Sequence, residues 1–164
     1  MNAVGNAYYM TLIRHAKSSW KAPVESDFDR PLNQRGRRDA PRMGAELARL
    51  GIQFDTVLCS SAVRARQTLA GLRQGMTIDD SCIVYRRELY LAPVHTLYDM
   101  VHELADTPRD IALIGHNPGI EDLAARLSGG IVDYMPTCCV VRIAFQNPAE
   151  GGRIEFVRLA RELA

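Results

Sequence analysis

The sequence predicts a three-layer α/β/α sandwich around a mostly parallel sheet with an antiparallel edge. Short apolar runs of strand length alternate with segments whose apolar residues recur at helical spacing, which is typical of parallel sheets covered by helices. Near the carboxyl end, the strand-like runs CVVRIAF and RIEFVRLA flank the turn Gly151-Gly152, as neighbouring antiparallel strands do. The 164 residues suit one domain, which we expect to span residues 1–164.

The composition is that of an ordinary globular protein. Apolar residues make up 47% and charged residues 24% of the chain, and the net charge of +1 gives no general attraction to nucleic acid or membranes. No apolar run reaches the roughly 20 residues of a membrane-spanning helix, and the start MNAVGNAYYM lacks the pattern of a signal peptide. We therefore expect a cytoplasmic protein whose four cysteines stay reduced.

The first elements flank a polar loop. The run Tyr9–Ile13 predicts a short buried strand, and Val24–Gly36 predicts a loop that leads into a helix with Asn33 as its N-cap. Pro41 conflicts with a straight helix from Asn33, so we expect the regular part to begin near Asp39, with Pro41 in its first turn. The apolar stripe of this helix and the glycine that ends it are Ala40, Met43, Gly44, Leu47, Leu50 and Gly51.

The next elements continue the alternation. We expect strands at Asp55–Ser61 and Ile111–Ile114, with a helix at about Ala62–Gln74. Two more helices follow from apolar stripes, one made of Leu97, Met100, Val101 and Leu104, the other of Ile120, Leu123, Ala124 and Leu127. Because ligands of such sheets bind beyond the carboxyl ends of the strands, that edge is where we expect a functional site.

Three polar motifs follow three of these strands at their carboxyl ends. They are Arg14-His15, then SSAVRARQT with Arg64 and Arg66, then IGHNPG with His116. A guanidinium fork suits phosphate, and a neutral imidazole is a competent nucleophile near pH 7. If the strands are neighbours, the pattern predicts phosphoryl transfer to a histidine. Alone, each motif also has a structural explanation: a surface Arg-His pair, a solvated helix face for Arg66, or a turn at GHNPG.

Together the motifs resemble the histidine phosphatase superfamily, also called the phosphoglycerate-mutase-like superfamily, and in particular its compact SixA-like phosphohistidine phosphatase branch. LIRHAKSSW is similar to the family's Arg-His-Gly signature, SSAVRARQT to its Ser-x-x-x-Arg-Ala-x-Gln-Thr run, and ALIGHNPGI to its second histidine motif. RPLNQRGRRDA and YMPTCCVV resemble the family's loop and helix after the first motif and its later strand, so the resemblance runs from about Met10 to Phe145.

The resemblance implies a phosphoglycerate-mutase-like fold and a phosphatase that needs neither metal ion nor cofactor. His15 would be the nucleophile that is transiently phosphorylated, and Arg14, Arg64 and His116 would bind the phosphate. The implied substrate is a phosphomonoester or a phosphohistidine, carried by another protein or by a small metabolite. The chain is too short for the insertions that bind the sugar phosphate of the mutases, which favours an open site and a phosphorylated protein as partner.

Two further positions have candidate roles by the same resemblance, and two others depart from the family pattern. Glu88 stands where the family often places the acid that protonates the leaving group, and its alternative is a surface ion pair with Arg86 or Arg87. Ser18 fits a small hydroxyl position that binds phosphate. The chain departs from the pattern at Ala16, where the family has glycine, and at Lys21, where the larger mutases often have asparagine.

Other functions fit less well. A cysteine-dependent phosphatase would need an arginine where Ala65 stands, six residues after Cys59, and a metal site would place a cation beside the arginines. His95 and His102 share a helix face away from the motifs, which favours structural roles. A non-catalytic module for phosphorylated partners would use the same arginines but would not need the nucleophile.

The basic cluster RGRR could be a solvated helix face. With Lys21, the side chains of Arg35, Arg37 and Arg38 could instead form a rim that attracts an acidic phosphoprotein. Nearby aspartates offset the cluster and no aromatic residues are interleaved with it, which argues against nucleic acid as a partner.

Overall fold

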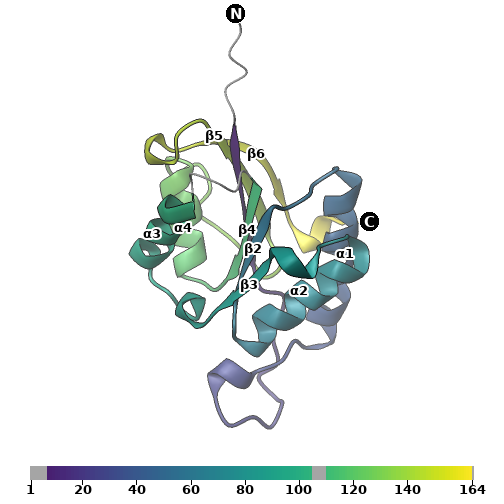
Figure 1. Ribbon diagram of the computed structural model, residues 1–164. Coiled ribbons are helices and arrows are strands. Elements are labelled where there is room, and N and C mark those ends of the chain that lie inside the picture. The colour runs from purple at the N-terminus through teal and green to yellow at the C-terminus, as the bar shows by residue number, and fades with distance from the viewer. Residues whose placement is uncertain (1–6, 105–109, 164) are drawn as a thin grey trace, which may run out of the picture.

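One mixed sheet of the order β3-β2-β4-β1-β5-β6 forms the centre of the computed structural model, which describes residues 7–104 and 110–163 (Figure 1). The strands are β1 Tyr8–Arg14, β2 Thr56–Ser60, β3 Ile83–Arg86, β4 Asp110–Gly115, β5 Val140–Phe145 and β6 Arg153–Arg158. The first four are mutually parallel, whereas β5 is antiparallel to β1 and β6 is antiparallel to β5. The expected parallel sheet with an antiparallel edge is therefore confirmed.

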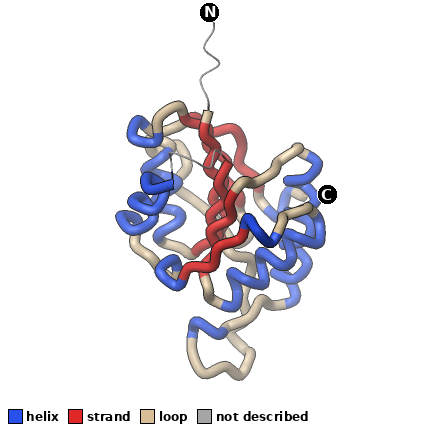
Figure 2. Tube along the Cα trace, viewed as in Figure 1, coloured by secondary structure: helices blue, strands red, loops and turns tan. Residues whose placement is uncertain are grey.

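Helices cover both faces of this sheet, as Figure 2 shows with strands in red between two sets of blue helices. They are α1 Gln34–Arg49, α2 Val63–Gly75, α3 Val94–Leu104 and α4 Gly119–Leu127, with short 3-10 turns η1 Asp27–Asp29, η2 Asp80–Cys82, η3 Arg87–Leu89, η4 Pro148–Glu150 and η5 Ala160–Glu162. The core accordingly forms two clusters, one under α1 and α2 and the other under α3 and α4. No helix in the described part of the chain is long and apolar enough to cross a membrane.

The register of the parallel strands brings their carboxyl ends to one edge. Ile114 of β4 pairs with Ile13 of β1 on one side and with Cys59 of β2 on the other. The backbone N–H of His15 also donates to the carbonyl of Gly115 over 3.1 Å. The residues that follow these three strands are therefore neighbours in space although they are far apart in the sequence.

The start of α1 differs from the expected one. Asn33 is the N-cap, because its side-chain oxygen accepts the Gly36 N–H over 2.9 Å. The helix then runs without a break through Pro41, so the expected start near Asp39 was wrong. Pro41 removes only one intrahelical hydrogen bond. The turn before it is held by the cap and by close packing, since a Cβ added at Gly36 would lie 2.2 Å from the carbonyl oxygen of Lys17.

Sequence reasoning did not identify the edge strand β3. Its side chains Val84 and Tyr85 are 37% and 44% exposed, so they lack the alternation of buried and exposed residues that indicates a strand. At the opposite edge, β5 and β6 pair as the two final apolar runs predicted.

Candidate active site

His15 follows β1 and is almost fully buried, with 6% of its surface exposed. Its Nδ1 lies 2.7 Å from the carbonyl oxygen of Ala16, which can only accept, so the ring proton is assigned to Nδ1. Nε2 therefore carries the lone pair, and the Nε–H of Arg64 donates to it over 3.3 Å. Burial, followed by the charges of nearby arginines, lowers the pKa of His15 to about 3. The imidazole is thus neutral at physiological pH, as a nucleophile must be.

His116 follows β4, and its ring lies beside that of His15, with 5.1 Å between the ring centroids. Its Nε2 is 2.7 Å from the hydroxyl of Ser60, which already accepts the N–H of Ala62. We assign the Ser60 hydroxyl as the donor to Nε2, which places the ring proton of His116 on Nδ1. That Nδ1 is buried and has no partner in the described structure. Burial lowers the pKa of His116 to about 3, so its ring is neutral as well.

Two arginines flank these rings. Arg64, in the first turn of α2, is 2% exposed, and its Nη1 and Nη2 donate to the backbone carbonyl and the carboxylate of Asp27 over 2.7 and 3.1 Å. Arg14, at the end of β1, donates from Nη1 to the carbonyl of Met135 over 3.1 Å, while its Nε is buried without a partner in the described structure. Both guanidinium groups are fixed by protein contacts and still present donors to the cavity.

Asp27, Arg30 and Tyr90 belong to the same network, and sequence reasoning missed their part in it. The Asp27 carboxylate accepts from Tyr90 Oη over 2.5 Å, from Arg30 Nε over 2.9 Å and from Arg64. The hydrogen bond from Tyr90, with those from the arginines, lowers the pKa of Asp27 to about 2. Arg30 also donates to the Ser18 hydroxyl over 2.9 Å. Asp27 in η1 and Tyr90, which follows η3, belong to no motif singled out from the sequence, so only the fold could bring them together.

Both histidines, three of the arginines and Asp27 line a cavity of about 320 Å³ beyond the carboxyl ends of β1 and β4. Every predicted site residue except Glu88 lines it, and the full lining is Arg14, His15, Lys17, Ser18, Trp20, Asp27, Arg30, Arg64, Leu91, His116, Asn117 and Thr137. Trp20 is 77% and Leu91 51% exposed at its rim. The structure therefore joins two neutral imidazoles, three arginines and a single carboxylate around one open space.

Glu88 and Arg66 lie outside this cavity. Glu88 is exposed on η3, and within the described residues it makes no ion pair with Arg86 or Arg87 either. The guanidinium of Arg66 lies over the ring of Tyr85, 4.7 Å from its centroid, which is the helix-surface position that sequence reasoning favoured for it.

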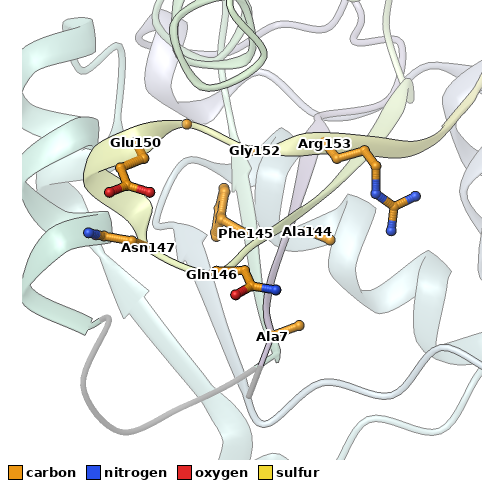
Figure 3. Close-up of a pocket in the computed structure, with 9 residues that line it drawn as sticks. Ala7, Ala144, Phe145, Gln146, Asn147, Glu150, Gly152 and Arg153 are labelled. Atoms are coloured by element: carbon orange, nitrogen blue, oxygen red, sulfur yellow. The ribbon is translucent and has the colours of Figure 1, made fainter. Parts of the chain in front are cut away.

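A larger cavity, of about 460 Å³, lies at the opposite end of the sheet, where β5 turns into β6 (Figure 3). Ala7, Phe145 and Gly152 are among its lining, with Glu150 and Arg153 as its charged residues. It offers neither a histidine nor a cysteine. In the described part of the chain, no group of three or more histidines, cysteines and carboxylates could hold a metal ion.

Known proteins resemble the chain over most of its length. A sequence model of the histidine phosphatase superfamily (branch 1) matches residues 10–87. An uncharacterised protein of Mycobacterium tuberculosis is 37% identical over 139 residues, which cover 85% of this chain and 83% of the relative. Among solved structures, a protein of Agrobacterium tumefaciens described as the phosphohistidine phosphatase SixA is 28% identical, with a TM-score of 0.79 over 93% of this chain and 98% of that one. The protein histidine phosphatase SixA in complex with tungstate has a TM-score of 0.83 at 22% identity over 93% and 97% of the two chains, a likeness of fold alone.

Proposed function

The chain belongs to the histidine phosphatase superfamily, branch 1, and on that premise we propose that it is a phosphatase that works through a phosphohistidine on His15 without a metal ion. The observation that carries the proposal is the state of His15. Its Nε2 is unprotonated and accepts from Arg64, and Arg14 and His116 line the same cavity as His15. A site that only bound phosphate would have no use for the unprotonated Nε2 of His15, which has no hydrogen to donate to an anion.

In the proposed reaction, the Nε2 lone pair of His15 attacks phosphorus as the bond from phosphorus to the leaving group breaks. The guanidinium groups of Arg14 and Arg64, with the Nδ1–H of His116, stabilise the charge on the phosphoryl oxygens. Water then attacks the phosphorus of phosphorylated His15, which releases inorganic phosphate and restores the imidazole. The hydroxyl of Ser18 and the guanidinium of Arg30 supply further donors at the same cavity.

We propose a phosphohistidine on another protein as the substrate. The carboxyl group that lines the cavity belongs to Asp27, whose pKa of about 2 keeps it ionised and unable to donate a proton near pH 7. A phosphorylated nitrogen is an easier leaving group than an alkoxide and has less need of such an acid. The likeness to proteins described as SixA supports the same choice. For a phosphomonoester of a small metabolite, Glu88 is our candidate acid, and it would have to reach the cavity from η3.

The test is release of inorganic phosphate, in EDTA, from an aryl phosphate and from a phosphohistidine peptide. We expect wild type to hydrolyse the peptide faster, and His15→Ala to lose activity on both by at least about a thousandfold. His102→Ala, on α3 and away from the cavity, is the matched control and should retain activity. Equal activity of His15→Ala and wild type would refute the role of His15. Binding of the phosphopeptide without any turnover would instead favour a non-catalytic module.

A further inference from the structure

A second cavity, of about 280 Å³, adjoins the catalytic one. Arg14, Lys17 and Thr137 line both cavities, so they form the boundary across which one ligand could extend. The rest of the second lining comes from α1, from the segment between α4 and β5, and from the carboxyl-terminal residues, namely Arg35, Tyr134, Pro136, Leu159, Ala160 and Arg161. Arg35 was a candidate for a basic rim from the sequence, but only the fold places it in one lining with Lys17 and Arg161.

The walls of this second cavity are cationic. Its lining holds Arg14, Lys17, Arg35 and Arg161, which we call the cationic groove, and it includes no carboxylate. Among the described residues, Lys17 and Arg161 make no ion pair. Arg35 contacts the buried carboxylate of Asp39 over 3.4 Å, and that single charge is shared with two further arginines. The groove therefore keeps a net positive charge.

This charge lies beyond the place where a phosphoryl group must sit to react. The phosphorus has to come within bonding reach of Nε2 of His15, which lines only the first cavity, whereas Arg35 and Arg161 line only the second. Their charge is therefore available to another anionic group of the same ligand. Both arginines are exposed and come from separate segments, and Tyr134 of the same lining is 62% exposed. Such an open, extended surface suits a polypeptide better than a compact second phosphate.

We propose that the cationic groove binds acidic side chains of the phosphorylated protein, next to the residue whose phosphoryl group enters the catalytic cavity. The inference rests on the proposed function and adds a sequence preference to it. Glutamate or aspartate on one side of the phosphorylated residue would meet Arg35, Lys17 and Arg161, which raises the rate of productive encounter and holds the segment in register.

The test compares two phosphohistidine peptides that differ only in whether the flanking residues are glutamate or glutamine. At low salt we expect wild type to prefer the glutamate peptide by about tenfold in kcat/KM, since each exposed ion pair contributes a factor of a few. The double variant Arg35→Gln/Arg161→Gln should lose this preference and keep its activity on an aryl phosphate. Arg153→Gln, an arginine 77% exposed at the opposite end of the sheet, is the matched control and should keep the preference.

An equal rate of wild type on both peptides, or an unchanged preference in the double variant, would overturn the proposal. If wild type prefers a short alkyl bisphosphate over the corresponding monophosphate but does not distinguish the two peptides, the cationic groove binds a second phosphate and not acidic side chains. If neither the aryl phosphate nor the peptides are hydrolysed, the proposed function fails. Calorimetric titration with the unphosphorylated glutamate peptide then tests separately whether the cationic groove binds acidic side chains. Binding lost in the double variant would support the groove, and no binding to wild type would refute it.

Discussion

At the scale of single residues, burial determines the charge of the candidate site. His15 and His116 would each be partly protonated near their ordinary pKa, but desolvation and the neighbouring arginines hold the pKa of both at about 3. The hydrogen bond from Tyr90, with those from Arg30 and Arg64, keeps Asp27 ionised, with a pKa of about 2. The cavity therefore contains neutral bases and one fixed anion throughout the physiological pH range, and each of these states can be tested.

The lowered pKa of His15 and His116 predicts a loss of stability in acid. Between about pH 6.5 and pH 3 the unfolded chain binds protons on these histidines that the folded chain does not. The free energy of unfolding therefore decreases as the pH is lowered through that window. Above pH 6.5 neither state is protonated there and the effect is absent. Urea unfolding at pH 7.0 and pH 4.5 should differ by about 2 kcal/mol or more.

Carboxylates also destabilise proteins in acid, so the variant His15→Asn isolates the contribution of the histidine. Its stability should depend less steeply on pH than that of wild type over the same window. Identical slopes for the two proteins would mean that His15 titrates normally in the folded state.

A second prediction concerns Asp27, whose carboxylate occupies donors of Arg30 and Arg64 that a phosphate would also use. Asp27→Asn removes a charge that repels phosphate and competes for these donors, so inorganic phosphate should inhibit the variant about fivefold more tightly. Asp29→Asn is the control, because Asp29 is exposed and bonds only the hydroxyl of Ser26, over 2.7 Å, among the described side chains. Weaker inhibition in Asp27→Asn would show that the carboxylate mainly positions the arginines.

The residues that sequence reasoning found and those that it missed differ in one respect. Arg14, His15 and His116 stand at strand ends, where a parallel sheet exposes functional groups, so their convergence could be expected. Asp27 lines the cavity and Tyr90 bonds it from outside the lining, and their partnership depends on a contact between positions 63 residues apart. No local pattern encodes such a contact.

At the scale of elements, α1 and α2 approach each other closely through glycine. A Cβ added at Gly44 of α1 would lie 2.1 Å from the carbonyl oxygen of Leu72 in α2, and one at Gly75 would lie 2.4 Å from that of Pro41. These contacts are with backbone atoms, which cannot move aside for an added methyl group as the end of a flexible side chain can. Because α2 carries Arg64 in its first turn, this close contact also fixes the depth at which that guanidinium enters the site.

Gly44→Ala should therefore force the two helices apart and lower the free energy of unfolding by about 2–3 kcal/mol, as overpacking of a core does. Gly51→Ala is the matched control. It has open space for the methyl group but a φ of +74°, so only the backbone penalty of about 1 kcal/mol remains. Chemical denaturation of both variants gives the comparison, and equal losses would contradict the close-contact explanation.

The same scale shows why some elements were predictable. The stripe of α1 includes Met43 and Leu47, which are fully buried, and the pattern predicted them. The start of α1 was mispredicted because proline costs a helix one hydrogen bond. The N-cap at Asn33 and the close packing at Gly36 stabilise the first turn by more than that loss. The strand β3 was missed, since it is short and exposed and does not alternate between apolar and polar residues.

At the scale of the whole molecule, the two ends of the sheet serve different purposes. The catalytic cavity lies at the carboxyl ends of β1 and β4, whereas a buried ion cluster lies nearer their amino ends. There Arg142, 4% exposed, donates to Asp110 over 2.6 and 2.9 Å, to Glu155 over 3.1 Å and to Thr11 over 2.9 Å. This cluster joins β1, β4, β5 and β6 without contacting the site.

Arg142→Met should therefore reduce stability and spare activity. Leaving Asp110 and Glu155 without their buried partner is expected to cost about 3–5 kcal/mol of unfolding free energy. For the protein that remains folded, kcat/KM on an aryl phosphate should stay within about twofold of wild type. Arg153→Met, whose exposed arginine lies 3.9 Å from Glu155, is the control and should change stability by less than about 0.5 kcal/mol. A large loss of kcat/KM in folded Arg142→Met would show that the two ends are coupled.

The fluorescence of one residue at the rim of the cavity can be used to observe the candidate site. The chain contains a single tryptophan, Trp20, and its ring stacks on the guanidinium of Arg30, 3.5 Å from the ring centroid. Arg30 in turn contacts both Ser18 and Asp27 at the cavity. An anion that enters there changes the field around the indole, so the intrinsic fluorescence spectrum of the unlabelled protein reports whether the site is filled.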